Sequence, residues 1–287
     1  MKPPSAEATA PACWACGAAA SLDDLFAPEG LYRCPACGLL FAPFENADSL
    51  EQLYDDEYFE EYAAGESYDD DEAQRRHEAR IRVALVREYL DTGRLLEIGT
   101  ASGYFLDEAR AAGFEVQGVE PGEAMARQAR ERFGLDVKTG IVEHVDLPEN
   151  GFDAVCAWHV VEHLAGPERA LERIKRALRP GGYLLLEVPN LESVNAHRWG
   201  KKWVNLDLGH HVAHYRRSSL EALLSRTGFE LLAMDTFPAL AYVRPMRSLR
   251  PIILATQAKE LLVVRTKPRR PHPWKHELLR SVARLPG

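Results

Sequence analysis

Short apolar runs alternate with amphipathic stretches through the middle of the chain. The runs have the length and the Val, Ile and Leu content of buried strands, and they lie at 95–98, 116–120, 154–158 and 183–188. A helix is expected at 167–178, where Pro167 stands in the first turn and Pro180-Gly181-Gly182 follows the end. Strands that alternate with helices predict a parallel sheet covered by helices on both faces.

Periodicity also predicts elements outside this central region. They are a helix at 74–90, a helix from a cap at Ser218 to Arg226, a strand at 230–234 and a last strand at 261–265 that closes the sheet edge. The stretch 237–259 contains three prolines and receives no assignment.

A glycine turn connects the first predicted strand of the sheet to a helix. Gly99 permits a sharp turn at the strand end, and Gly103 leaves room for a ligand at the helix start. The next strand ends at Glu120, about 20 residues further on, where a carboxylate can accept hydrogen bonds from both hydroxyls of a ribose. The pattern therefore predicts a ligand that carries a nucleoside.

Length and charge limit the classes of protein to consider. A chain of 287 residues can hold one α/β domain and a small accessory module. The net charge of −8 argues against a general affinity for polyanions. Apolar runs are too short to span a membrane and no secretory signal pattern stands at the N-terminus, so a cytoplasmic protein is expected.

Charge is distributed unevenly along the chain. The segment 46–71 is acidic and rich in tyrosine, which predicts short helices or a lid. The C-terminal end is basic; it could contact RNA, anionic lipid or an acidic partner, but a solvated terminal helix is the favoured interpretation. The expected parts are a four-cysteine module at 10–45, a helical or lid-like linker at 46–92, a Rossmann-like domain at 93–267 and a basic tail at 268–287.

Four of the five cysteines form two Cys-x-x-Cys pairs near the N-terminus. Cys13, Cys16, Cys34 and Cys37 can supply four thiolates to one tetrahedral Zn²⁺. Four thiolates leave no position for water, so the zinc would be structural. Two disulfides are the alternative, and they are rarer in the cytoplasm. Cys156 lies in an apolar run and is interpreted as a core residue.

Several motifs in this order resemble the class I S-adenosylmethionine-dependent methyltransferases that carry an N-terminal zinc-binding module. The motifs are Glu97-Ile98-Gly99-Thr100-Ala101-Ser102-Gly103, Gly118-Val119-Glu120, Leu147-Pro148-Glu149-Asn150-Gly151-Phe152-Asp153, His159-Val160-Val161-Glu162-His163 and Leu178-Arg179-Pro180-Gly181-Gly182. The resemblance implies an α/β, Rossmann-like sheet of seven strands whose last strand is antiparallel, preceded by a small zinc-ribbon-like module.

The resemblance also implies a set of contacts to S-adenosylmethionine. Glu97, Gly99 and Gly103 would line the methionine end, and Glu120 would hold the ribose. Ile141 and Val142 fall where related enzymes contact adenine, although the acidic residue often found there is replaced by apolar ones. The further contacts expected along the turn and the strand ends are Thr100, Ser102, Tyr104 and Trp158.

A histidine-containing motif follows the strand at 154–158. His159 is the first candidate for a general base, because it stands at the carboxyl edge of the sheet and titrates near neutral pH; a structural or cofactor-contacting histidine is the alternative. His159, Glu162 and His163 share one face of a helical turn. In the similar ubiquinone-pathway O-methyltransferases, a Glu-x-x-Glu-His series at this place is associated with a divalent cation, so a second metal is left open.

A second histidine set precedes the helix expected at Ser218. His211, His214 and Tyr215 resemble the family's signature of histidines with an aromatic residue, and His210 is expected to be exposed. Asn190, Trp199 and Trp203 could complete the wall of an acceptor pocket. His211 and His214 would either face that pocket as catalytic residues or brace the loop.

Three functions from different classes remain. The leading one is a methyltransferase that acts on a small molecule, by O-methylation of a sugar, glycan or natural-product intermediate. An RNA methyltransferase would use the zinc module to dock RNA, but Arg33 is the only Lys or Arg around the cysteine pairs, so nucleic acid is not the expected partner. A non-catalytic protein that keeps the cofactor fold is the third. The oligomeric state is not indicated by any motif.

Overall fold

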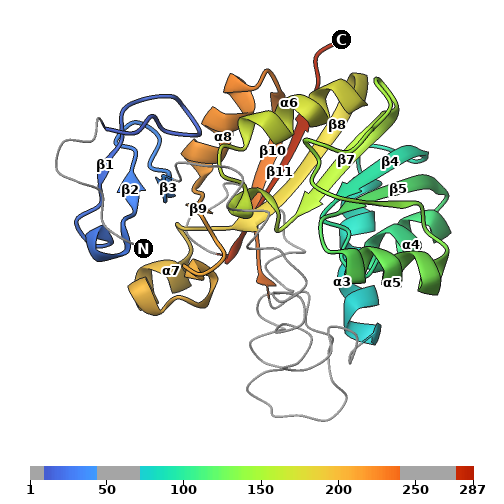
Figure 1. Cartoon of the computed structure of the whole chain (residues 1–287), viewed down its shortest axis with the longest axis horizontal. Coiled ribbons are helices and arrows are strands. Elements are labelled where there is room, and N and C mark those ends of the chain that lie inside the picture. The colour runs from blue at the N-terminus through green and yellow to red at the C-terminus, as the bar shows by residue number, and fades with distance from the viewer. Residues whose placement is uncertain (1–9, 44–71, 240–275) are drawn as a thin grey trace.

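The computed structural model describes residues 10–43, 72–239 and 276–287. These residues form a small N-terminal module beside a larger α/β part built on a central sheet (Figure 1). Among them, no helix combines the length and the apolar character needed to cross a membrane. Expectations for the segments 44–71 and 240–275, including the lid at 46–71 and the strand at 261–265, lie outside the described residues.

The central sheet has seven strands in the order β10-β11-β8-β7-β4-β5-β6. The strands are β4 (Gly93–Ile98), β5 (Phe114–Glu120), β6 (Val137–Thr139), β7 (Phe152–Trp158), β8 (Leu178–Pro189), β10 (Glu230–Phe237) and β11 (Leu278–Arg284). The pairs β4–β5, β4–β7, β5–β6 and β7–β8 are parallel. Strand β11 is antiparallel to both of its neighbours, β8 and β10. The predicted Rossmann-like sheet with an antiparallel last strand is confirmed.

Helices cover both faces of this sheet (Figure 1). The helices α3 (Glu72–Val86), α4 (Tyr104–Ala111) and α5 (Glu123–Phe133) share a core with one face. The helices α6 (Glu168–Ala177) and α8 (Arg217–Arg226) share a core with the other face. Because strand side chains alternate between faces, Leu95 packs with the first set and Leu96 with the second. Cys156 is fully buried in the first core, as the sequence predicted.

The N-terminal module forms a second, four-stranded sheet in the order β1-β2-β3-β9. Its own strands are β1 (Ser21–Leu22), β2 (Tyr32–Arg33) and β3 (Leu40–Phe41), with the short helix η1 (Ala27–Glu29) between β1 and β2. The fourth strand, β9 (Ala213–His214), comes from the far end of the chain. The module is therefore joined to the α/β part by a shared sheet.

The connection between β8 and β9 consists of short helices. They are α7 (Val194–Trp199), η4 (Gly200–Lys202) and η5 (Val204–Leu206), and η3 (Val161–His163) follows β7. Trp203 and Leu206 pack against Phe26, Leu31 and Leu40 of the module. This packing places the α7–η5 connection next to the module (Figure 1).

Two local predictions are wrong. Ser218 does not cap α8: the N-cap is Arg216, whose amide donates to Ser219 Oγ, while Ser218 Oγ donates to the carbonyl of Cys37. The basic C-terminal end is not a solvated helix over 278–284. Strand β11 lies there between β8 and β10, its apolar side chains are buried in the cores on the two faces of the sheet, and Arg280 is buried in an ion pair with Glu187.

Candidate active site

Four parallel strands end at one edge of the sheet and bring acidic and aromatic side chains there. Glu97 is the second-last residue of β4, Glu120 ends β5, Trp158 ends β7 and Glu187 lies near the end of β8. Ligands of open α/β sheets bind at this carboxyl edge. The sequence predicted Glu97, Glu120 and Trp158 for it and missed Glu187.

The turn after β4 requires glycine at two positions. Gly99 has φ +73°, and a Cβ there would lie 2.6 Å from Val160 Cγ2. Gly103 has φ +89°, and a Cβ there would lie 2.7 Å from Leu135 Cδ1. Side chains would therefore strain the turn and close the space around it. The amides of the first turn of α4 follow directly, as the glycine pattern predicted.

Glu120 holds this turn from the neighbouring strand. Its Oε2 accepts a hydrogen bond from the amide of Ala101 at 2.7 Å, and its Oε1 accepts one from the amide of Gly122 at 3.0 Å. Burial raises the pKa of Glu120 to about 7, although both amide bonds act to lower it. A buried carboxylate at the crevice, with lone pairs left on each oxygen, is suited to accept hydrogen bonds from ribose hydroxyls.

Two polar groups near the turn have no protein partner among the described residues. Glu97 is 3% exposed, its Oε2 has no hydrogen bond, and burial raises the pKa of Glu97 well above its usual range. Ser102 Oγ is also buried without a partner, whereas Thr100 Oγ1 donates to the carbonyl of Glu97 at 3.3 Å. Buried polar atoms without partners are costly unless a ligand satisfies them. The set fits the ammonium and hydroxyl donors of S-adenosylmethionine.

The other expected cofactor residues surround this turn. Tyr104 opens α4, and its ring packs against Phe133 at 5.3 Å between ring centres. Ile141 and Val142 follow β6; Ile141 is partly exposed and Val142 is buried. The ring of Trp158 packs edge-on against Phe105 at 5.4 Å. The structure thus gathers the predicted residues around the carboxyl edge of β4, β5, β6 and β7.

A buried ion cluster lies beside this edge and was not predicted. Glu187 is fully buried; its Oε1 lies 3.1 Å from Arg82 Nη2, and its Oε2 accepts from Arg280 Nε at 2.6 Å. The charges of both arginines hold the pKa of Glu187 well below its usual range, although burial acts to raise it. The signal in the sequence was a single acid inside an apolar strand; its partners come from α3 and β11.

His159 belongs to this ion cluster. Its Nδ1 lies 3.2 Å from Glu162 Oε1 and its Nε2 lies 3.3 Å from Glu187 Oε1. Burial acts to lower the pKa of His159, but the hydrogen bonds to the two carboxylates raise it to about 9. An imidazolium that donates both protons to carboxylates cannot accept another at neutral pH. The geometry therefore argues against the predicted role of His159 as the general base.

Three side chains meet on the other side of Glu162. The ligand-capable atoms of Glu162, His163 and His211 all lie within 4.8 Å of one another. Nδ1 of His163 lies 3.2 Å from the carbonyl of His210, and Nδ1 of His211 lies 2.9 Å from the carbonyl of Asn205. A carbonyl only accepts, so both Nδ1 atoms carry the proton, and in the neutral ring the lone pair is on Nε2. Burial lowers the pKa of His163 to about 4, so its ring is neutral at pH 7.

The remaining residues of this loop have structural contacts. His214 is 3% exposed, and its Nε2 lies 2.6 Å from the carbonyl of Leu206. Tyr215 is fully buried, and its hydroxyl has no hydrogen-bond partner in the described ranges. His210 is partly exposed and pairs with Asp207 at 3.0 Å. His211 is thus the residue of this set whose ring is partly exposed and packs against the ring of His163, with 4.7 Å between the ring centres.

The four N-terminal cysteines converge on one point. Cys13 Sγ lies 3.5 Å from Cys37 Sγ, Cys16 Sγ lies 3.4 Å from Cys34 Sγ, and all four lie within 4.8 Å of one another. No cysteine is in a disulfide. A tetrahedral zinc with bonds of about 2.3 Å places sulfur atoms about 3.8 Å apart. The donor set and its spacing fit a Zn²⁺ ion.

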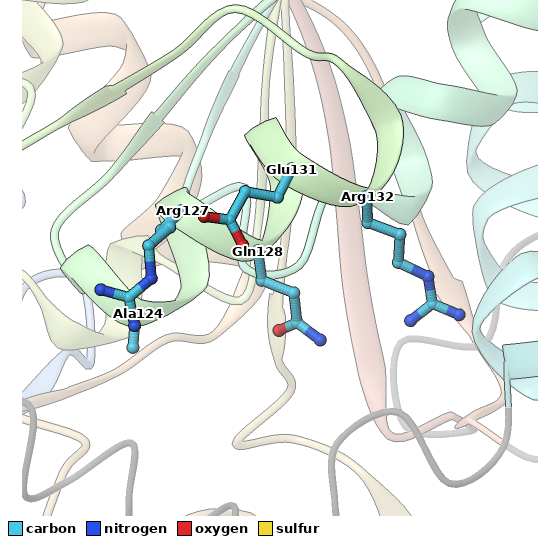
Figure 2. A pocket seen from close by; sticks show the side chains of 5 residues that line it. All are labelled: Ala124, Arg127, Gln128, Glu131 and Arg132. Atoms are coloured by element: carbon cyan, nitrogen blue, oxygen red, sulfur yellow. The ribbon is translucent and has the colours of Figure 1, made fainter.

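A surface pocket lies on α5, and one of its residues, Arg132, lies over the ring of Tyr104 with 5.1 Å from its Cζ to the ring centre. It is lined by side chains from consecutive turns of one helix, namely Ala124, Arg127, Gln128, Glu131 and Arg132 (Figure 2). None of them belongs to the carboxyl edge or to the cysteine cluster. We assign this pocket no role in the reaction.

Comparison with known proteins identifies the family to which this chain belongs. A family model described as a methyltransferase domain matches residues 71–234, more than half of the chain. The chain belongs to this family of methyltransferase domains.

Individual relatives agree with this family. A probable S-adenosylmethionine-dependent methyltransferase of Mycolicibacterium smegmatis is 29% identical over 139 residues, which are 48% of this chain and 52% of the relative. A ubiquinone biosynthesis O-methyltransferase of Nitrobacter winogradskyi is 29% identical over 127 residues, 42% of this chain and 44% of the relative. The chain spans about half the length of these curated relatives.

A solved structure shares the fold. The crystal structure of a SAM-dependent methyltransferase from Thermotoga maritima, described as a possible histamine N-methyltransferase, matches with a TM-score of 0.57 and 21% identity. The match covers 82% of this chain and 99% of that chain. This likeness concerns the arrangement of the helices and strands.

Proposed function

We propose that this methyltransferase O-methylates a small molecule of the sugar, glycan or natural-product class, with a histidine as general base. The observation that carries the proposal is the contact of His211 with His163 beside Glu162, next to the strand end at Trp158. A hydroxyl acceptor must lose its proton as it takes the methyl group, and a histidine at this edge can receive that proton.

The donor side needs alignment rather than covalent chemistry. S-adenosylmethionine supplies an activated methyl group when it is bound. Glu120 would orient the ribose, Glu97 and the Gly99–Gly103 turn would hold the methionine end, and Ile141 and Val142 would contact the adenine. Correct alignment with exclusion of water lowers such a barrier by about 7–11 kcal/mol.

Among the four candidate histidines, His211 is our choice as the base. Its Nδ1 proton is directed to the carbonyl of Asn205, which leaves the lone pair on Nε2, and its ring is partly exposed. His163 has a pKa of about 4, which makes it a poor base near neutral pH. We therefore give it the role of packing against His211. His159 and His214 are proposed to hold the neighbouring carboxylates and the loop.

A divalent cation is a second candidate at the same place. Glu162, His163 and His211 supply one carboxylate and two imidazoles, and Glu162 Oε2 is buried with no partner in the described part of the chain. Each imidazole directs its other nitrogen to a backbone carbonyl, as metal-binding histidines do. The sequence left open a metal held by His159, Glu162 and His163. In this second candidate His211 takes the place of His159. A bound cation would lower the pKa of a coordinated acceptor hydroxyl.

The four cysteines are proposed to hold a structural zinc. With four thiolate ligands, the ion would stabilise a module whose own strands have only two residues each. The module offers little to RNA: Arg33 lies 2.5 Å from Asp23 and is engaged in that ion pair. This contact and the overall acidic charge favour a small acceptor over nucleic acid.

The experiment is isothermal titration with S-adenosylhomocysteine, followed by transfer of a tritiated methyl group to a panel of sugars, phenols and RNA. His211→Gln should keep cofactor affinity and lose about 10²–10⁴-fold in turnover. His144→Gln, a change at an exposed histidine, should leave both unchanged. Absence of cofactor binding at millimolar concentration, or transfer to RNA alone, would refute the proposal. Full activity in excess EDTA would refute the divalent cation.

A further inference from the structure

The strand that carries the second histidine set is paired with the cysteine module. Strand β9 pairs antiparallel with β3, with Leu40 opposite His214 and Phe41 opposite Ala213. It forms the fourth strand of the module's sheet, and the next residue, Tyr215, makes an isolated parallel bridge with Asn190 at the end of β8. Val212 directly precedes this strand, and His211 lies one residue before Val212. The position of β9 therefore depends on the module.

Val212 connects the module to the turn that carries Glu162. Its carbonyl accepts a hydrogen bond from the amide of Ala42 at 2.9 Å, and its amide donates to the carbonyl of Glu162 at 3.0 Å. Val212 is 4% exposed, so both bonds are shielded from water. Val212 thus connects the end of β3 to η3. A displacement of β3 would therefore move His211 on one side of Val212 and the η3 residues Glu162 and His163 on the other.

Helix α8, which follows β9 in the chain, is hydrogen-bonded to the backbone of both cysteine pairs. Ser218 Oγ donates to the carbonyl of Cys37 at 2.8 Å. Arg226 donates to the carbonyl of Ala15 at 3.0 Å and to that of Trp14 at 2.6 Å. The backbone of the two Cys-x-x-Cys pairs, which shapes the metal site, is therefore hydrogen-bonded to the helix that follows β9.

The cysteine cluster and the histidine strand also share one core. Cys13, Cys34 and Cys37 belong to the same buried cluster as Ala213 and Tyr215. No layer of solvent separates the module from the acceptor side.

We infer that the four-cysteine module is a wall of the acceptor side of the active site, and that Zn²⁺ in it sets the position of His211, Glu162 and His163. Ser218 and Arg226 are positioning residues in this arrangement. The inference rests on the proposed zinc and on the proposed role of the histidine cluster. It assigns the module to positioning within the enzyme and not to the docking of a separate macromolecule.

The first test compares zinc-loaded and EDTA-treated full-length protein by hydrogen–deuterium exchange and by NMR of ¹⁵N-labelled histidine. Loss of zinc should raise exchange at least tenfold at 211–215 and 161–163, and it should shift the signals of His163 and His211. Exchange at 95–98 and 116–120, and the affinity for S-adenosylhomocysteine, should change less than twofold. An increase in exchange confined to 12–42 would overturn the inference.

A second test uses variants in case zinc removal unfolds the whole chain. Ser218→Ala and Arg226→Ala each remove hydrogen bonds to a backbone carbonyl of a Cys-x-x-Cys pair. Each should therefore speed zinc release to a chromogenic chelator by about fivefold. Both should shift the His163 and His211 signals. Ser225→Ala on the exposed face of α8 is the matched control and should change neither. Faster zinc release with unmoved histidine signals would contradict the coupling.

These readouts separate the inference from the proposed function. Exchange and histidine signals report the coupling even when no acceptor is known. Failure of His211→Gln to affect turnover would remove the proposed base and leave the coupling intact. Failure of zinc to affect the histidine signals would remove the coupling and leave the proposed base intact.

Discussion

At the residue scale, Glu120 organises the glycine turn through two backbone hydrogen bonds, and we propose that it also holds the ribose of the cofactor. Its two backbone bonds use one lone pair on each oxygen and leave the others for hydroxyl donors. Its pKa of about 7 lies above the ordinary value of 4.5, so the folded protein binds more protons than the unfolded chain between these two pH values. Its contribution to stability therefore decreases as pH rises from 4.5 to 7.

The same titration should be visible in cofactor binding. Ribose hydroxyls donate preferentially to an ionised carboxylate, so affinity for S-adenosylhomocysteine should rise about tenfold from pH 6 to pH 8, with proton release. Glu120→Gln should weaken binding and flatten this pH profile. Glu123→Gln, at an exposed glutamate at the start of α5, should preserve it. Titration calorimetry in buffers of different ionisation enthalpy measures both; an unchanged profile in Glu120→Gln would contradict the assignment.

His159 gives a pH dependence of stability at higher pH. Its folded pKa of about 9 lies above the ordinary 6.5, so its ion pairs stabilise the protein fully below pH 6.5 and are lost as pH rises to 9. Its side chain is 35% exposed, so solvent screening limits the effect to about 1–2 kcal/mol. Urea unfolding at pH 6 and pH 9 should show a loss in the wild type that His159→Gln lacks. His144→Gln should behave as the wild type, and equal losses in all three would argue against the ion cluster.

At the scale of elements, the last strand is the part of the sheet that most depends on distant sequence. Strand β11 is hydrogen-bonded along its whole length to β8 on one side and to β10 on the other. Removing 278–287 would leave β8 as an open edge and β10 without a partner strand, and it would take Val282 out of the core. We expect soluble yield to fall at least tenfold. Removing only Pro286 and Gly287, which are exposed, should leave the yield and the melting temperature unchanged, and a soluble, folded 1–277 chain would contradict the topology.

The elements that were predictable from the sequence are those with local signals. The strands β4, β5, β7 and β8 have short apolar stretches near glycine or proline, and the structure has strands where these stretches indicated them. The sequence of β11, Leu-Leu-Arg-Ser-Val-Ala-Arg, lacks the alternation of a half-exposed strand because both of its faces are covered. Its partners lie about 50 and 90 residues earlier in the chain, so no local pattern marked it.

The candidate site shows the same division. The turn at Gly99–Gly103 and Glu120 form one local motif, and the sequence pattern indicated both. Arg82 and Arg280 come from α3 and β11 and meet only at Glu187, so their role depended on the tertiary fold. His159 was identified as a site residue for its position, but the two carboxylates that fix its charge could not be assigned to it before the strands were aligned.

At the scale of the whole molecule, the module and the methyltransferase sheet have a common core. Phe41 and the cysteines belong to the same buried cluster as Leu96, Val155 and Leu186 of the central strands. A cluster that crosses from one sheet to the other predicts that both parts lose their structure in one global unfolding transition in urea. A ligand that binds one part should then stabilise the other.

This cooperativity can be measured through the cysteines. In a urea series on zinc-loaded protein, the four thiols should become reactive to Ellman's reagent in the same transition in which the helical circular dichroism is lost. S-adenosylhomocysteine at about 100 times its dissociation constant should stabilise the native state by about 2.7 kcal/mol and move both signals equally. An independently folded module would release its thiols at a lower urea concentration that the cofactor product does not change. That result would separate the module from the catalytic domain, because a ligand bound at the Glu120 edge can protect Cys13 and Cys37 only through the shared core.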